Sequence, residues 1–281
     1  MDWVASLNSA IEYIENHLTE NLNNSNIARH VFLSGAHFQR AFTLMTGITV
    51  GEYIRCRRLT LAGHELTQTG AKVVDTAYKY GYETPESFSK AFSRFHGCSP
   101  MEAKRGEANL KSLNRLSIKI ILEGAIIMDY RIVKEEAFEV VVKAKRFGNE
   151  QDSAKDVPAF WDEYFAEELH LKVSPDLGVC EPHTEGSGSW RYGIGCNKDS
   201  VHDIPDGFEV WAVPQNTWAV FKCVGAMPKA IQDMWKRIFS EWLPQAKYEM
   251  AQTYDFEKYF TGDTASDDYI SEIWIPIKEK C

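Results

Sequence analysis

The sequence lacks the patterns that mark a membrane protein, a disulfide-stabilised secreted protein or a zinc protein. No apolar run approaches the roughly 18 residues of a membrane span, and residues 1–3 do not begin a basic and apolar signal peptide. The six cysteines are scattered without a CxxC pair, which fits reduced cytosolic thiols better than a disulfide framework. These absences predict a cytoplasmic protein that does not bind membranes and uses no metal or other cofactor.

Signatures of catalysis are also missing. The chain contains no GxSxG motif and no Ser, His and Asp order typical of a hydrolase. Its eight histidines are too dispersed to form a metal-ligand cluster. We therefore do not expect an enzyme of these classes.

Basic residues are outnumbered, with 31 Lys and Arg against 40 Asp and Glu and a net charge of −9. A uniformly acidic chain would be a poor nucleic-acid binder, but the charge is unevenly distributed. Residues 1–120 hold 14 basic against 11 acidic side chains, and the remainder holds 17 against 29. This asymmetry indicates a basic N-terminal part and an acidic C-terminal part with different tasks.

A short pattern occurs twice in the basic part. The stretch FQRAF at residues 38–42 recurs as FSKAF at residues 88–92. A Gly, a hydroxyl residue, a Glu and an Arg follow each copy at the same offsets. Agreement of residue type at a fixed offset indicates a duplicated supersecondary unit.

Helix signals surround each copy of this pattern. Apolar spacing and cap residues predict helices over 3–18, 26–31, 35–46, 50–67, 73–80 and 85–96, and a last helix after Ser99. A short helix, a tight turn and a second helix form a helix-turn-helix, and here the unit occurs twice. The connecting helix over 50–67 is about 28 Å long, which approaches the ~34 Å repeat of the DNA major groove.

Polar residues on the outward face of each second helix are the candidate base readers. In the first unit Ala36, Gln39, Arg40 and Thr43 are predicted to face outward, and Gln39 and Arg40 suit adenine and guanine contacts. In the second unit Glu86 repels phosphates, so we expect less base readout there. The alternative interpretation is an all-α bundle that binds no nucleic acid.

Residues 34–66 closely resemble the DNA-binding domain of AraC/XylS-type bacterial transcription regulators, nearest to the group of Rob, MarA and SoxS. Residues 77–100 resemble the end of that domain, with its Gly-Tyr turn and its Phe-x-Gly-x-Ser-Pro motif. The resemblance covers roughly residues 5–107 and implies binding to double-stranded DNA and action with RNA polymerase. Tandem units allow either a monomer or a dimer to bind. The DNA-contacting positions that it implies are Ser34, Gly35, Ala36, Gln39, Arg40, Arg55, Thr84, Pro85, Glu86, Ser87, Ser89 and Lys90.

One departure from the resemblance concerns the first reader. Members of the Rob and MarA group carry a Trp where Ala36 stands in this sequence. We therefore expect this chain to read a different first half-site.

Beyond a linker the hydrophobic period changes from helical to alternating. Strands are predicted near residues 130–132 and 140–142 and over 177–181 and 190–196, with a helix beginning at Pro158. The same order returns as strands over 208–213, 218–224, 254–260 and 269–277, with a helix from Pro228 to Trp242. The predicted fold class is therefore multidomain: an all-α tandem helix-turn-helix domain and an α+β domain of two pseudo-symmetric ββαββ halves. We expect such a duplication to place two sheets about a pseudo-twofold axis with a cleft between them, which is a usual place for a small ligand.

The expected cleft is rich in aromatic residues, since seven of the eight tryptophans follow residue 160. Aromatic faces together with a buried carboxylate suit planar or cationic ligands. Residues 126–279 resemble the GyrI-like effector-binding domain, also found in Rob and in BmrR, through PAFW at 158–161, WRYGIG at 190–195 and FEKY at 256–259. The resemblance implies that Glu257 lies in the ligand pocket, with Glu272 as the alternative carboxylate. The candidate aromatic walls are Trp161, Tyr164, Trp190, Tyr192 and Trp274.

Together these patterns predict a DNA-binding domain at 1–107, a linker at 108–125 and a small-molecule-binding domain at 126–281. The leading hypothesis is a transcription regulator, by resemblance an activator, that responds to an amphiphilic, cationic or aromatic small molecule. One alternative is a GyrI-like hydrolase of small electrophilic compounds, in which burial would raise the pKa of Glu257 so that it acts as a base. Another is a protein that sequesters drugs or toxins without signalling.

Overall fold

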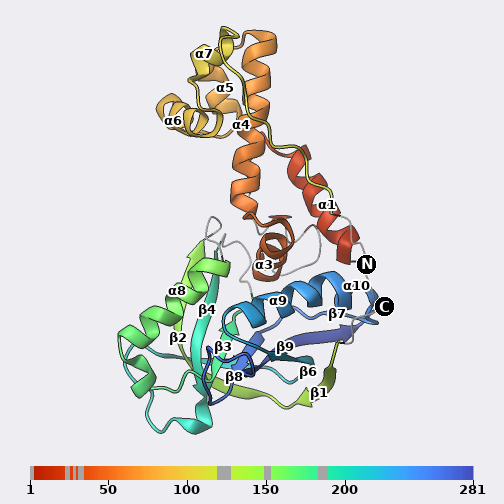
Figure 1. The fold of residues 1–281 in the computed structure, drawn as a ribbon, viewed down its shortest axis with the longest axis vertical. Helices are drawn as coiled ribbons and strands as arrows, with labels where there is room; N and C mark the ends of the chain where they lie inside the picture. The colour runs from red at the N-terminus through yellow and green to blue at the C-terminus, as the bar shows by residue number, and fades with distance from the viewer. Residues whose placement is uncertain are drawn as a thin grey trace.

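The computed structural model describes residues 3–22, 26–27, 30, 35–118, 128–148, 153–182 and 189–280. Figure 1 shows two bodies stacked along the long axis, with a helical N-terminal part above a sheet that carries helices on one face. Among these residues, no helix combines the length and the hydrophobicity needed to cross a membrane.

The first helical unit contains α1 (Trp3–Asn16), α3 (Gly35–Thr46) and the start of α4 (Val50–Thr69). Half of the helix predicted over 26–31 lies outside the described residues. The predicted apolar stripe is buried, and Phe38, Phe42 and Tyr53 are fully enclosed. Thr49 caps α4 by accepting a hydrogen bond from the backbone N–H of Glu52 at 3.1 Å, which confirms the predicted start of the long helix.

The second unit repeats this arrangement at the far end of α4 with α5 (Val73–Lys79), α6 (Pro85–His96) and α7 (Pro100–Lys104). The predicted helix boundaries are confirmed: Thr84 caps α6, Pro85 takes its first position, and Gly97 ends it with a φ of 83° that favours glycine. Ser99 and Glu102 form the reciprocal capping box that begins α7. The local signals of both units therefore act as the sequence indicates.

The segment 107–118 has no regular secondary structure but is held along α4 by hydrogen bonds. The backbone N–H of Leu116 donates to the Tyr53 hydroxyl at 3.1 Å. Asn8 on α1 makes two hydrogen bonds of 2.9 Å with the backbone of Ile118. The start of the predicted linker is therefore docked on the first unit, which the sequence pattern did not indicate.

An ion pair between α1 and α4 fixes this docked segment. Arg57 Nε and Nη2 donate to the Glu15 carboxylate at 2.8 and 2.7 Å, and Arg57 Nη1 donates to the carbonyl of Leu113 at 2.6 Å. The Arg57 and Glu15 side chains are only 11% and 10% exposed. Burial favours a higher pKa for Glu15, but the hydrogen bonds from Arg57 and Tyr53 outweigh it and lower the pKa.

The C-terminal part is built on an antiparallel sheet of nine strands in the described residues. Its order is β1-β6-β9-β8-β3-β4-β2-β5, and β7 pairs with β9. The strands are β1 (Tyr130–Glu135), β2 (Phe138–Gly148), β3 (Leu177–Cys180), β4 (Ser189–Asn197), β5 (Glu209–Val213), β6 (Asn216–Val224), β7 (Tyr248–Met250), β8 (Asp255–Tyr259) and β9 (Ile270–Glu279).

The strand order confirms the two predicted ββαββ halves. The prediction that they form two sheets is wrong, because β3 and β8 pair and join the halves in one sheet. Strands β3 and β8 pair at the centre of the sheet. The first strand of each half pairs with a strand of the other half, since β1 pairs with β6 and β5 pairs with β2. The order therefore has the same pattern when it is followed from either end. The short strand β7 breaks the symmetry and was not predicted.

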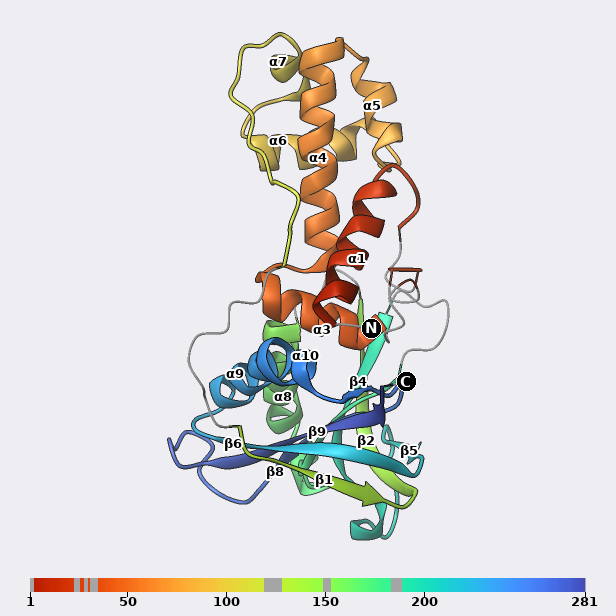
Figure 2. The same cartoon turned by 90° about the vertical axis from the view of Figure 1, so that its right-hand side faces the viewer.

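Each half carries its helix on the same face of the sheet (Figures 1 and 2). Helix α8 (Ser153–Ala166) contains Pro158 in its interior, so the prediction that Pro158 begins the helix is wrong. Proline removes one backbone donor, and a helix anchored by packing tolerates this loss. Helix α9 (Lys229–Arg237) begins just after Pro228 and continues as a π-helical turn (Ile238–Trp242) and α10 (Leu243–Gln245). Short 3₁₀ turns occur at Leu169–Leu171 and Lys198–Ser200.

Alternation along the strands separates two apolar cores. Val141 on β2 packs in the cluster that includes Phe160 and Tyr164 of α8. Its neighbours Val140 and Val142 pack in a second cluster on the opposite face of the sheet. In the described part of the chain, helices cover the first of these faces, which is therefore available to a helix-lined pocket.

The two parts of the chain meet through the first helical unit. Helix α3 lies between α4 and the α/β part and contacts α8, α9 and β4 (Figure 2). Phe38 and Phe42 of α3 belong to the same apolar cluster as Trp235 of α9 and Phe239 of the π-helical turn that follows α9. The second unit extends away from the sheet (Figure 1).

We expect the Arg57→Met substitution to lower the free energy of unfolding of the helical part by about 2–3 kcal/mol, because it leaves a buried carboxylate without its charged donor. Urea denaturation followed by circular dichroism measures this loss. The matched control is Arg55→Met, whose partner Glu52 is 3.9 Å away with both side chains about half exposed. The control should change stability by less than about 0.5 kcal/mol. Equal losses in the two variants would contradict the role assigned to Glu15.

Candidate functional site

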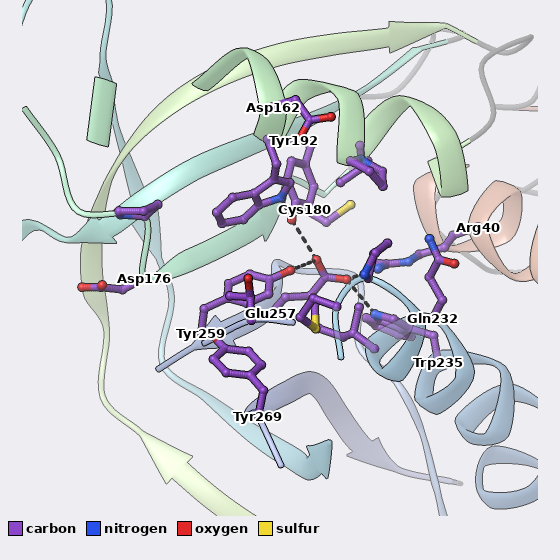
Figure 3. A pocket seen from close by; sticks show the side chains of 18 of the residues that line it. Arg40, Asp162, Asp176, Cys180, Tyr192, Gln232, Trp235, Glu257, Tyr259 and Tyr269 are labelled. Carbon is purple, nitrogen blue, oxygen red and sulfur yellow. Dashed lines mark hydrogen bonds and ion pairs between the residues drawn. The ribbon is translucent and has the colours of Figure 1, made fainter. Parts of the chain in front are cut away.

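A pocket of about 560 Å³ lies between α8 and α9 over the centre of the sheet. Tyr192 of β4, Glu257 and Tyr259 of β8 and Trp235 of α9 line it (Figure 3). Trp161 of α8 lines it as well. The pocket is therefore built from both pseudo-symmetric halves, as the predicted cleft required.

Glu257 is the central polar group of this pocket and is 2% exposed. Its Oε2 accepts hydrogen bonds from the hydroxyls of Tyr192 at 2.8 Å and Tyr259 at 3.0 Å. Its Oε1 accepts from the indole N–H of Trp235 at 2.8 Å and from the guanidinium of Arg40. Four donors thus converge on one buried carboxylate (Figure 3).

Glycine at position 178 makes this convergence sterically possible. Gly178 on β3 pairs with Glu257 on β8. A Cβ at this position would lie 1.9 Å from the Tyr192 hydroxyl oxygen and 3.2 Å from Glu257 Oε2. A larger residue would push the tyrosine away from the carboxylate, so Gly178 is a site residue that sequence reasoning missed.

The ionisation of Glu257 follows from its partners. Burial alone would raise the pKa of this carboxyl, but the Arg40 charge and the hydrogen bonds from Tyr192, Trp235 and Arg40 lower it below its ordinary value. The pKa values of Tyr192 and Tyr259 are raised far above normal, by burial first and then by the Glu257 charge. The two phenols therefore stay protonated and remain donors to an ionised carboxylate.

Aromatic rings enclose the carboxylate. The indole N–H of Trp161 donates to the Tyr192 hydroxyl at 3.2 Å, and the Trp161 ring lies edge to face with Tyr259 at 4.7 Å between centroids. Trp235 faces the same space from α9 (Figure 3). An ionised carboxylate among π faces is an arrangement that attracts an organic cation.

Four of the seven predicted ligand residues line the pocket: Trp161, Trp190, Tyr192 and Glu257. Tyr164 instead lies in the core beneath α8, where its hydroxyl donates to the carbonyl of Val173 at 2.8 Å. The pocket roles expected for Glu272 and Trp274 are wrong, because the strand register pairs Lys258 with Glu272 and Phe256 with Trp274. Residues paired in this way lie on the same face of the sheet. Glu272 and Trp274 therefore share the face of Lys258 and Phe256, which is opposite to the face of Glu257.

Glu272 and Trp274 belong to a hydrogen-bonded cluster on the face of the sheet opposite to the pocket. Arg131 of β1 binds Glu272 through two hydrogen bonds of 2.8 and 3.0 Å, and the Trp274 indole donates to the same carboxylate at 2.9 Å. The pKa of Glu272 is lowered because the bonds from Arg131 and Trp274 outweigh burial. This carboxylate is held by a strand residue of its own domain.

The first helical unit supplies one wall of the pocket through α3. Gln39, Arg40, Thr43 and Leu44 line it. The Arg40 guanidinium pairs with Glu257, lies 3.6 Å from Asp255 Oδ1 and stacks 4.0 Å from the ring centroid of Trp235. The prediction that this face of α3 points to solvent is wrong in this arrangement, since Thr43 is 8% exposed and the face packs on the α/β part.

The predicted DNA-binding residues of the first unit have different standings. Ser34 lies outside the described residues, and of Gly35 and Ala36 only the helical backbone is described. Arg55 on α4 is about half exposed beside Glu52. Their DNA contacts stay predictions.

The predicted reading face of the second unit is largely exposed. On α6 the side chains of Glu86, Ser87 and Lys90 are exposed, and Ser89 is half-buried. Thr84 accepts a hydrogen bond from the Ser87 backbone at 3.1 Å and so positions the N-terminal turn. The second reader, expected to be the weaker one, is therefore the one that is accessible here.

Comparisons with known proteins match both parts of the chain. Residues 131–277 match the family of integron-associated effector binding proteins, and residues 27–106 match a helix-turn-helix domain family. The HTH-type transcriptional activator AarP of Providencia stuartii is 34% identical over 114 residues, which cover 41% of this chain and 84% of AarP. The regulatory protein SoxS of Salmonella typhimurium is 36% identical over 96 residues, 34% of this chain and 90% of SoxS.

A solved structure is similar to the C-terminal part. The structure of SAV2435 bound to tetraphenylphosphonium is 27% identical, covers 54% of this chain and 94% of that chain, and has a TM-score of 0.48. The match over 131–277 covers the α/β part, and the match over 27–106 covers most of the tandem helical units. The chain therefore belongs to the integron-associated effector binding protein family and carries the DNA-binding domain of AraC-type transcription regulators, so that it is a DNA-binding regulator with an effector-binding domain.

Proposed function

We propose that the effector is an amphiphilic organic cation with aromatic or apolar groups, and that it binds in the pocket around Glu257. The observation that carries this proposal is an ionised carboxylate, 2% exposed, surrounded by Trp161, Tyr192, Trp235 and Tyr259. A buried charge requires a counter-charge, and an organic cation supplies one together with surface for the rings. A volume of about 560 Å³ suits a drug-sized molecule.

On the DNA side, we assign base and phosphate contacts to the faces of α3 and α6. Helix α4 has 20 residues, which corresponds to a length of about 30 Å. This length supports the placement of α3 and α6 in two successive major grooves of DNA. Resemblance to activators supports activation together with RNA polymerase in the bacterial cytoplasm, where the DNA is. Residues 1–107, 108–125 and 126–281 serve as reader, connection and sensor.

The hydrolase alternative is weaker than binding. A general base near neutral pH needs a carboxyl whose pKa is raised, whereas the pKa of Glu257 is lowered. The nearby Cys180 is a poor nucleophile, because burial raises the pKa of its thiol well above normal. A sequestering protein without signalling would not need a DNA-binding domain.

We expect Glu257→Gln to reduce the preference of the full chain for a cation over a neutral compound of the same shape. The matched probes are methyltriphenylphosphonium and triphenylphosphine oxide, titrated by tryptophan fluorescence. The ratio of their affinities should fall about 10- to 100-fold. This range corresponds to the free energy that an interaction with a charged group contributes in a buried site.

The control for this titration is Glu272→Gln, which alters a paired carboxylate beside a tryptophan on the far face. Its affinity ratio should equal that of the wild type. If Glu257→Gln also keeps the wild-type ratio, the cation site proposed here does not exist.

Lys90→Ala should weaken DNA binding and reduce the slope of log K against log salt by about 1, because it removes one phosphate contact. Fluorescence anisotropy with a duplex at several salt concentrations measures the slope. Lys278→Ala removes an exposed charge from β9 and should leave the slope unchanged. An unaltered slope in Lys90→Ala would remove α6 from the DNA interface.

A further inference from the structure

Arg40 occupies the cation position of the effector pocket. It comes from α3 of the DNA-binding part, and its side chain is only 17% exposed. Its guanidinium makes the three kinds of contact that define the pocket: an ion pair with Glu257, a second carboxylate, Asp255, at 3.6 Å, and the face of Trp235 at 4.0 Å. Figure 3 shows the side chain reaching from α3 into the space between Glu257 and Trp235.

From this geometry we infer that Arg40 is an internal competitor of the effector, so that a cation must displace it and thereby releases α3 for DNA. This inference rests on the proposed function, since it concerns the same pocket. A second cation cannot reach both Glu257 Oε1 and the Trp235 face while the guanidinium is there, and two like charges side by side repel each other. Occupancy by Arg40 and by a cationic effector is therefore mutually exclusive.

The same residue links the pocket to DNA recognition. A second helix of a helix-turn-helix reads DNA by inserting its face into the major groove. On α3 this face carries Gln39 and Arg40, and both line the pocket. While α3 packs against α8 and α9, the groove-reading face is occupied by the chain's own sensor.

The second unit does not share this restraint. Helices α5 to α7 lie at the end of α4 away from the sheet (Figure 1), and the outward side chains of α6 are exposed. The closed arrangement therefore presents one reader, and displacement of Arg40 presents two. Because effector and DNA both require Arg40 to leave the pocket, each should strengthen the binding of the other.

The competition also sets the ligand preference. A neutral aromatic molecule can contact the walls of the pocket but offers Glu257 no charge in exchange for Arg40. It should therefore bind without releasing α3. A permanent cation satisfies the carboxylate and the Trp235 face together, so Arg40 acts as a specificity-determining residue.

The first test removes the competitor in the full chain. Arg40→Met keeps the length of the side chain but not its charge. Methyltriphenylphosphonium should bind this variant at least about tenfold more tightly than the wild type, because its site is no longer occupied. Arg94→Met, an exposed position on α6, should bind the probe as the wild type does. Equal affinities of Arg40→Met and wild type would overturn the competition.

The second test uses DNA binding without effector. A duplex is enriched from random sequences by the Glu257→Gln chain and is then titrated with each variant. Glu257→Gln weakens the hold on Arg40, so its basal affinity for DNA should exceed that of the wild type at least about tenfold and should not respond to the cation. Glu272→Gln should retain the low basal affinity and the response.

This second test distinguishes failure of the internal competition from failure of the proposed cation site. If Glu257→Gln loses its cation preference but binds DNA as the wild type does, the internal competition is refuted and the cation site stands. If Glu257→Gln keeps its cation preference, the proposed function fails and the competition fails with it.

A third measurement needs no variant. Small-angle scattering of the wild type should show a larger radius of gyration with saturating methyltriphenylphosphonium, because α3 leaves the sheet domain, and no change with triphenylphosphine oxide. A profile that both compounds leave unchanged, although the cation binds, would refute the release of α3.

Discussion

The need of one buried carboxylate for a positive partner shapes the relation between the two parts of this protein. Glu257 is held in place by Tyr192, Tyr259 and Trp235, and those neutral donors orient its charge without cancelling it. An unpaired ion at 2% exposure would be strongly destabilising. Arg40 of the helical part supplies the countercharge here. The position of α3 on the sheet domain therefore depends on chemistry that also suits a ligand.

The helical part was predictable from the sequence because its signals are local. Thr49, Thr84, Pro85 and Gly97 act through bonds and dihedral angles within one turn of their own position, so their roles do not depend on the rest of the chain. The strands were predictable in type and order of appearance, but not in partners. The exchange of β1 and β5 between the halves joins residues 67 to 91 positions apart, and no local pattern encodes it.

The part of the candidate site that could be predicted consists of residues that alternate with Glu257 along the same strand. Asp255 and Tyr259 lie two residues on either side of Glu257 and so share its face, which makes them recoverable from alternation alone. Glu272 and Trp274 lie on the neighbouring strand, and their face depends on the register between β8 and β9. A shift of one residue would have brought Glu272 to the pocket face. Arg40 came from another domain, so only the packing of α3 could reveal its position.

The properties that make Arg40 a good candidate for reading guanine are those that suit it to Glu257. A planar guanidinium pairs with carboxylates, with phosphates and with the acceptor edge of guanine through the same fork of donors, and it stacks on rings. The acidic pocket beside Trp235 therefore offers α3 interactions of the kind that DNA offers, within its own chain. On α6 the repeat places Lys90 at the position of Arg40, and Glu86 one turn earlier adds a negative charge that an acidic pocket would repel. This added carboxylate distinguishes the two predicted reading faces and fits an arrangement in which the α/β part holds α3 and leaves α6 exposed.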